Sequence, residues 1–162
     1  MANVDMGLKF EGGMDITGES KITNLEDQLV LTSFQFGATA GFSGFDTGGL
    51  GMGRTTMSEA VCTMYADKST PVLFKAIATH AHFDKITATV QRMGGEEPIP
   101  YMKYEMEDAA ISTYSTSVGG SNETNVSFSI VYKKMTVTYT PQNEDGTPGS
   151  EVSNEYDQSA GK

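Results

Sequence analysis

The sequence contains no tryptophan, one cysteine and two histidines among its 162 residues. The single cysteine, Cys62, excludes an intramolecular disulfide framework, so the chain can fold in a reducing compartment. Hydrophobic residues make up only 38% of the chain. This low content, together with the absence of tryptophan, fits a thin-walled β structure better than a large α/β enzyme.

Basic residues are also scarce, with 11 Lys and Arg against 21 Asp and Glu, for a formal net charge of −10. Such an acidic chain is not expected to bind nucleic acid or an anionic membrane surface. The N-terminal stretch has neither a basic segment nor an apolar segment of the kind found in secretory leaders. No apolar run is long enough to span a bilayer. Any export is therefore expected to proceed without a cleaved signal peptide.

Most of the chain alternates between apolar and polar residues with period two, which is typical of half-buried strands. About eight strands are expected, and the length suits a single domain, residues 1–162. This pattern favours a β-barrel or a β-sandwich. The polar residues at 151–162 are expected to fray after a weak last strand. The expected strands are residues 4–11, 28–37, 55–66, 85–92, 101–107, 109–116, 125–130 and 135–139.

One short helix is expected at about residues 71–80. Ser69 or Thr70 can cap its N-terminus, and Pro71 fits the first helical position because its missing N–H is not needed there. Leu73 and His80 are expected on the same helical face. The helix is expected to lie laterally, covering one end or one face of the barrel.

The stretch 38–54 is rich in glycine, which favours an extended, flexible loop. It also carries four large apolar side chains, which are unusual in a purely solvated linker. One interpretation is a loop whose apolar residues fold back on its own barrel. The other is a segment that becomes ordered against a second copy of the protein. The four side chains are Phe42, Phe45, Leu50 and Met52.

The strand expected at 28–37 has two different faces. Val30, Thr32 and Phe34 are expected on one face, and the other face becomes polar at Ser33 and Gln35. A polar half-strand of this kind is expected to face water or a channel.

No catalytic constellation is convincing in the sequence. His80, His82 and Asp84 have a spacing that could place three metal ligands on one face of a strand. They fall at a helix-to-strand junction, however, and no third histidine supports them. Cys62 has no base nearby in sequence, so a buried structural residue is expected. The glycine-rich stretch lacks the ending of a phosphate-binding loop, and no metal or cofactor is expected.

Several motifs, in their order and spacing, resemble the haemolysin-coregulated protein (Hcp) family, the tail-tube protein of bacterial type VI secretion systems. Ile16–Ser20 is similar to the family's GES loop, and Phe34-Gln35-Phe36-Gly37 stands where the family has aromatic-x-aromatic-Gly, commonly with tryptophan. The glycine-rich stretch follows at the matching place. Asp67–Leu73 matches the most specific signature, D-K-[SA]-[ST]-P-x-L.

The resemblance implies a β-barrel subunit, without catalysis, that assembles into hexameric rings stacked as a tube. The implied partners are other copies of the chain, a spike protein at the tube tip, a contractile sheath and effector proteins in the lumen. The protein would reside in the bacterial cytoplasm before firing and be secreted afterwards. By this resemblance the side chains at 42, 45, 50 and 52 are expected on a neighbouring subunit, with Ser33 and Gln35 facing the lumen.

Two other hypotheses remain from the residues alone. A monomeric secreted β-sandwich that binds, for instance, carbohydrate would also be acidic and rich in strands. An enzyme built on His80, His82 and Asp84 is the third hypothesis. Oligomeric state separates the first two hypotheses, and a stoichiometric metal assay tests the third.

Overall fold

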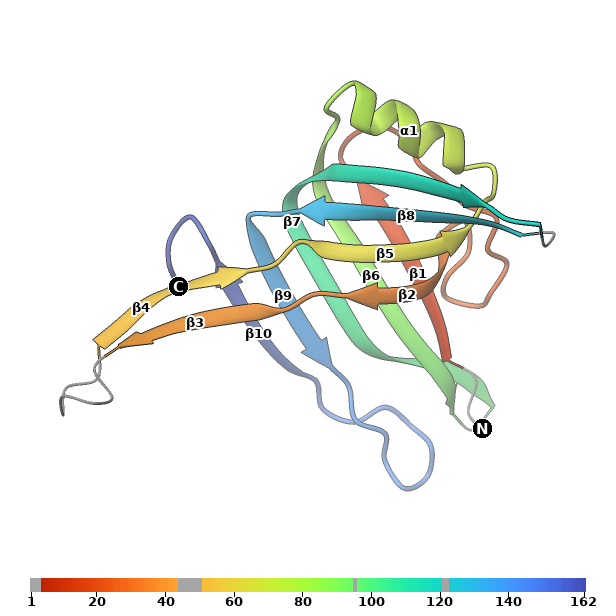
Figure 1. Ribbon diagram of the computed structural model, residues 1–162. Helices are drawn as coiled ribbons and strands as arrows, with labels where there is room; N and C mark the ends of the chain where they lie inside the picture. Colours follow the sequence, from red (N-terminus) through yellow and green to blue (C-terminus); the bar gives the residue numbers. More distant parts are fainter. Residues whose placement is uncertain (1–3, 44–50, 95, 121–122) are drawn as a thin grey trace.

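The fold is a closed six-stranded barrel with two additional strands on its outside and a long hairpin projecting from it (Figure 1). The computed structural model describes residues 4–43, 51–94, 96–120 and 123–162. Neighbouring strands around the barrel run antiparallel in the order β7-β6-β1-β2-β5-β8, and β8 pairs with β7 to close it. The barrel strands are β1 (Val4–Glu11), β2 (Leu29–Gln35), β5 (Ala60–Tyr65), β6 (His82–Gly94), β7 (Glu97–Val118) and β8 (Thr124–Val131). The expected β-barrel is confirmed.

The strand β7 is long enough to belong to two sheets. Its first half pairs with β9 (Lys134–Tyr139), which carries β10 (Val152–Asp157) at the outer edge, and its second half pairs with β8. The halves meet near Asp108, whose φ is +51°. The sequence predicted two strands here, but the backbone continues through this residue as one. The chain turns sharply between β8, which ends at Val131, and β9, which begins at Lys134.

The helix α1 (Thr70–Ala78) lies across one end of the barrel and packs against β7 (Figure 1). Its first turn is prepared by Asp67, whose carboxylate accepts a hydrogen bond from the Ser69 N–H at 2.8 Å. Leu73 is fully buried, as the spacing predicted. His80 is not on the buried helical face, because the helix ends at Ala78 and His80 has a φ of +54°.

The barrel interior is filled by aliphatic, aromatic and methionine side chains. Cys62 lies among them and is completely buried, which raises the pKa of its thiol. A buried neutral thiol is a small apolar residue rather than a nucleophile. The largest fully buried side chains include Phe83, Phe128, Leu8, Leu29, Leu73, Ile86, Met106 and Ile130.

One correction concerns the two faces of β2. Leu29 and Leu31 point into the barrel, and the register then shifts between Leu31 and Ser33. The irregularity places Phe34 against Tyr104, with ring centroids 4.9 Å apart. Val30 and Phe34 therefore lie on opposite faces, although the sequence predicted a common face. The alternation rule fails here because one extra residue reverses the parity of everything after it.

The loop between β1 and β2 is held against the start of β2 by a close backbone approach. Gly18 donates its N–H to the Asp27 carbonyl at 2.9 Å, and a side chain at this position would meet the Gln28 carbonyl oxygen 2.3 Å from its Cβ. The clash is with backbone, which cannot move aside as a flexible side chain would. The GES segment of the sequence thus has a steric reason for its glycine.

We expect Gly18→Ala to lower the free energy of unfolding by about 1–3 kcal/mol, the usual cost of overpacking. Urea denaturation monitored by circular dichroism measures it. Gly37→Ala is the matched control, because the nearest atom to its Cβ would be Ser58 Oγ at an ordinary 3.6 Å. Equal stability losses in the two variants would contradict the steric account.

Candidate interaction surfaces

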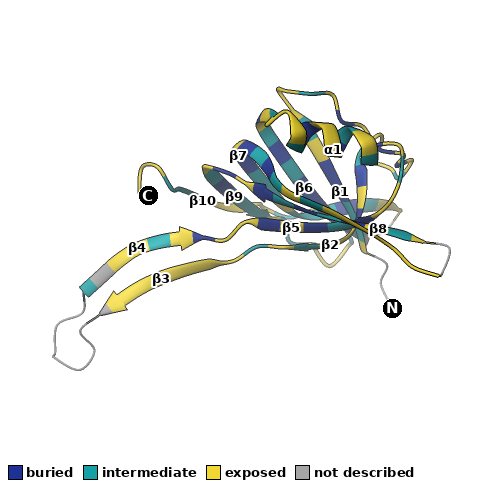
Figure 2. Cartoon of the chain, turned by 45° about the horizontal axis from the view of Figure 1, so that its top comes forward, coloured by how far each residue is buried: buried dark blue, intermediate teal, exposed yellow. Residues whose placement is uncertain are grey.

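The glycine-rich stretch contains a two-stranded hairpin, which we call the arm. It consists of β3 (Ala38–Ser43) and β4 (Gly51–Met57), and within the described residues these strands pair only with each other. Figure 2 shows the arm extending away from the barrel with most of its length exposed. Composition predicted a loop here because glycines hide the strand pattern. The arm therefore has a defined direction at its base.

Two glycines allow the strands of the arm to approach closely where their register shifts. A Cβ on Gly53 would lie 3.1 Å from the Gly41 carbonyl oxygen and 3.3 Å from the Gly41 Cα. The register shifts between Ala40 and Phe42 at the same place. These glycines are therefore needed for strand pairing as well as for flexibility.

The four apolar arm residues are only partly described. Phe42 is 54% exposed and stands opposite Met52 in the strand register. The backbone of Met52 belongs to β4, and its side chain lies outside the described part of the structure. Phe45 and Leu50 lie outside the described residues. An exposed aromatic ring on a projecting hairpin is a suitable contact for another protein surface.

The root of the arm is tied to the barrel at Ser58. Its hydroxyl accepts the Gly37 N–H at 2.7 Å, while its own N–H donates to the Gly37 carbonyl at 2.8 Å. The buried Tyr132 donates its hydroxyl to the Ser58 carbonyl at 2.7 Å. Burial raises the pKa of Tyr132 to about 12, so this donor keeps its proton at neutral pH.

One side of the barrel carries rows of uncharged side chains, most of them serine or threonine. Cross-strand partners in β2, β5, β8 and the second half of β7 place Ser33, Thr63, Ser127 and Ser115 in one row. The next row contains Gln35, Val61, Ser129 and Thr113. We call these two rows the hydroxyl wall. The residues before and after Thr63 and Ser127 are buried, so the wall faces outward.

The hydroxyl wall is free of charge in a strongly acidic protein. The described strands β2, β5 and β8 and residues 109–118 of β7 contain no Asp, Glu, Lys or Arg. Glu59, just before β5, meets the edge of the wall by accepting a hydrogen bond from Ser112 Oγ at 2.8 Å. Ser33 and Gln35 are both exposed, and each begins one of the rows. The wall is wettable but presents no fixed charge.

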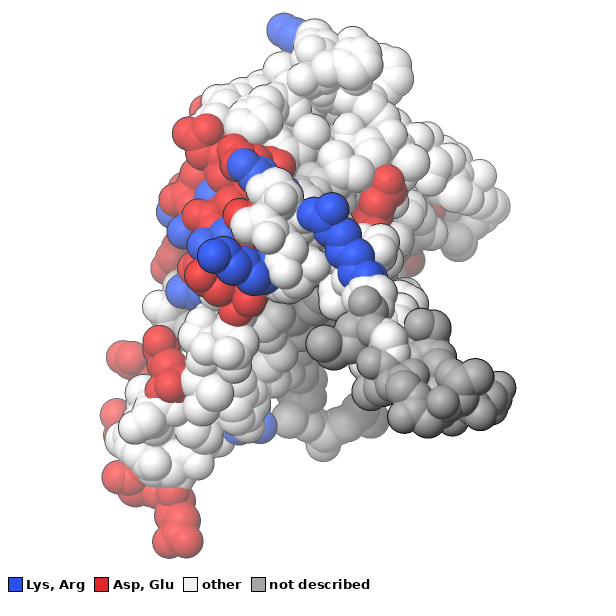
Figure 3. All heavy atoms as spheres, turned by 90° about the vertical axis from the view of Figure 1, so that its left-hand side faces the viewer, with Lys and Arg blue, Asp and Glu red and all other residues white. Residues whose placement is uncertain are grey.

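The other side of the barrel carries charges of alternating sign. A row of cross-strand partners runs over β1, β6, β7, β9 and β10. We call this row the charged ladder, and its members are Glu11, Lys85, Glu107, Lys134 and Asp157. Figure 3 shows acidic and basic side chains intermixed along this flank.

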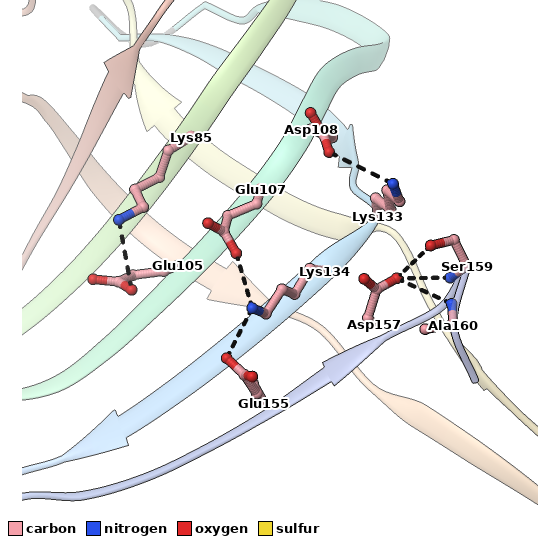
Figure 4. A network of polar contacts seen from close by, with 10 residues as sticks. All are labelled: Lys85, Glu105, Glu107, Asp108, Lys133, Lys134, Glu155, Asp157, Ser159 and Ala160. Atoms are coloured by element: carbon pink, nitrogen blue, oxygen red, sulfur yellow. Dashed lines mark hydrogen bonds and ion pairs between the residues drawn. The ribbon is translucent and has the colours of Figure 1, made fainter. Parts of the chain in front are cut away.

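Lys134 is the best-paired cation of the charged ladder (Figure 4). Its ammonium lies 2.9 Å from a Glu155 oxygen and 3.5 Å from a Glu107 oxygen. The hydrogen bond that Lys134 donates to Glu155 raises the pKa of Lys134, with a smaller effect from Glu107. Exposed pairs of this kind contribute little stability, so the ladder mainly balances charge across the strands.

The residues considered for metal binding or catalysis are not brought together. His82 lies 3.5 Å from Asp108 instead of joining His80 and Asp84. Within the described residues, no group of three His, Cys, Asp or Glu side chains could hold a metal ion. Among the carboxylates of β7, Glu105 and Glu107 are paired with lysines, which gives them a structural role.

A groove of about 790 Å³ lies between the start of β7 and the loop that joins β9 to β10. Carboxylates line it from both sides, including Glu97, Asp145 and Glu151, with Lys103 as a basic member. Two hydrogen bonds from Thr147 lower the pKa of Asp145. The lining of the groove is acidic and solvated, which matches the overall charge of the chain and identifies no particular ligand.

No helix in the described part of the chain is long and apolar enough to cross a membrane.

Comparisons with known proteins agree with this fold. The family model described as "Type VI secretion system effector, Hcp" matches residues 8–139. Protein hcp1 of Pseudomonas aeruginosa is 28% identical over 144 residues, covering 88% of this chain and 87% of that protein.

Two solved structures show the same architecture. A type six secretion system protein has a TM-score of 0.88 at 22% identity, covering 99% of both chains. Hcp1 from Salmonella typhimurium has a TM-score of 0.79 at 21% identity, covering 100% of this chain and 99% of that one. At these identities the structures establish the fold, and the family model, which spans most of the sequence, establishes the relationship. The chain belongs to the Hcp family of type VI secretion system proteins.

Proposed function

We propose that this protein is the structural subunit of a secreted tube, in which hexameric rings stack around an open lumen. Within the type VI system the tube would carry a spike at its tip, lie inside a contractile sheath and be expelled from the cytoplasm. Effector proteins would travel in the lumen without covalent attachment. The proposal assigns the protein no enzymatic activity.

The hydroxyl wall carries this proposal. A channel that passes different proteins needs a surface that is wetted but does not bind cargo strongly, and an uncharged face made mostly of serine and threonine has those properties. We assign this face, with Ser33 and Gln35 as its first members, to the lumen. In this arrangement the acidic side chains of the subunit lie on surfaces other than the lumen.

The arm supplies the contact between subunits in this proposal. Phe42 on the projecting hairpin is 54% exposed, and its exposed apolar area is removed from water when the arm meets another surface. We assign that surface to a neighbouring subunit of the tube and extend the assignment to Phe45, Leu50 and Met52. The monomeric binding module remains the competing function, and it requires no such contact.

Light scattering of the purified protein at tens of micromolar tests the proposal. A mass near six times the 17.4 kDa chain is expected. A monodisperse monomer across this range, in buffers of low and physiological salt, would contradict ring formation and favour the binding module.

Salt should strengthen ring stacking. Each ring would carry the net charge of six chains at −10 each, so stacked rings repel one another. The screening length falls from about 30 Å at 0.01 M to about 8 Å at 0.15 M ionic strength. Sedimentation at both ionic strengths is expected to show longer stacks in the higher salt. Shorter stacks there would mean that attractive ion pairs between rings outweigh the repulsion.

A further inference from the structure

The C-terminal segment contacts β4 near the root of the arm. The C-terminus lies beside β4 in Figure 1, although roughly a hundred residues separate the two segments in the sequence. Tyr156, in β10, donates its hydroxyl to the Thr55 carbonyl of β4 at 3.3 Å. The Arg54 guanidinium donates to the Gln158 carbonyl. Two adjacent residues of β4 are thus bound to the same segment.

The segment that receives the arm is itself firmly attached. Gln158 donates its backbone N–H to the Lys133 carbonyl at 2.9 Å, and its side-chain amide donates to the Tyr132 carbonyl at 3.0 Å. Tyr132 also holds Ser58 through its hydroxyl. The bend between β8 and β9 therefore supports the arm twice, directly at Ser58 and indirectly through Gln158.

Residues 157–162, which we call the C-terminal turn, are closed on themselves (Figure 4). The Asp157 carboxylate accepts the Ser159 N–H at 2.8 Å, the Ser159 hydroxyl at 2.7 Å and the Ala160 N–H at 3.3 Å. Gly161 donates to the Asp157 carbonyl at 2.9 Å, with a φ of +73° that glycine adopts without strain. These bonds hold the turn in the position where Gln158 meets the arm.

An isolated hairpin needs such support. Two-stranded hairpins are marginally stable in water, and the described strands of the arm pair with no third strand. A small rotation at the root would move the far end by many ångströms. Contacts at Arg54 and Thr55 lie beyond the Ser58 junction, so they restrict that rotation.

We propose that Arg54, Tyr156 and Gln158 are positioning residues that lock the arm in its assembly-competent direction. The C-terminal turn acts as a built-in support, so the arm reaches its neighbour already oriented instead of being ordered only on contact. Pre-orientation reduces the entropy lost on association. The consequence for assembly rests on the proposed tube function, whereas the support of the arm does not.

The test uses the full chain with Arg54→Met and Tyr156→Phe combined. Hydrogen–deuterium exchange read by mass spectrometry should show peptides covering β4 exchanging at least tenfold faster, while peptides covering β8 are unchanged. The concentration at which rings form, measured by light scattering, should rise about tenfold. Arg54→Lys keeps a charged donor and should recover part of the protection.

Lys134→Met is the matched control, because it removes ion pairs between β7, β9 and β10 without touching the arm. It should leave exchange in β4 unchanged. Unchanged β4 exchange in the double variant would overturn the proposal. If the double variant does not fold, the single variant Tyr156→Phe, which removes only the hydroxyl oxygen, replaces it. Unchanged β4 exchange in that variant would overturn the proposal in the same way. If the double variant shows faster β4 exchange but the parent protein forms no rings, the support of the arm by the C-terminal turn is upheld and the proposed tube function is refuted.

Discussion

Deleting residues 41–53 is expected to abolish ring assembly while leaving the barrel folded. The deletion removes the arm beyond Ala40, including all four apolar side chains assigned to a neighbouring subunit. Burying one such side chain is worth about 1.5–3 kcal/mol. Losing even two of the four at each contact therefore weakens association by about a hundredfold or more. Sedimentation velocity should show a monomer at concentrations where the parent protein is assembled.

The deletion needs a control that shortens another projecting loop. Residues 143–147 form a local turn closed by the Asn143 N–H to the Thr147 carbonyl at 2.8 Å, at the end of the barrel away from α1. Their removal should leave ring formation intact. Normal assembly of the arm deletion, with circular dichroism unchanged, would reduce the arm to a simple connection between β2 and β5.

Phe128→Ala is expected to give one of the largest losses of stability among single substitutions in the barrel. Phe128 is fully buried in β8 between the strands that carry Cys62 and Tyr114. Truncating a buried phenylalanine costs about 3–5 kcal/mol, a large fraction of the 5–15 kcal/mol that a domain of this kind possesses. Urea denaturation of the dissociated subunit measures the change.

Phe74→Ala is the matched control, because the same side chain in α1 is 60% exposed. The Phe74 ring contacts the Tyr114 ring, with centroids 5.8 Å apart, and the substitution removes this contact. We therefore expect only a small loss of stability, below about 1.5 kcal/mol. A cost at Phe74 similar to that at Phe128 would mean that α1, and not the closed barrel, dominates stability.

Local sequence signals predicted much of the fold because each acts over a few residues. Pro71 and the residues before it identified the helix, and alternation identified strands such as β1 and β6. The signals failed where tertiary pairing decides. Strand β7 continues through Asp108 despite the positive φ of this residue, because β9 pairs with the part of β7 before it and β8 pairs with the part after it. β10 has little apolar character and exists because the edge of β9 accepts it.

The interaction surfaces were harder to predict than the strands. Ser33 and Gln35 were recognisable as a polar half-face, but the rows they begin require the register of four strands, which pattern alone does not supply. The arm was recognised by its glycines, although its strand pairing was missed. The support from Tyr156 and Gln158 joins segments far apart in the sequence, so no local pattern could reveal it.

Negative-stain electron microscopy of the purified full chain tests the central claim most directly. The account predicts ring-shaped particles with six-fold symmetry and an open centre, which stack end to end as protein and salt concentrations rise. A field of small, solid particles without rings, at concentrations of tens of micromolar and physiological salt, would contradict the tube subunit.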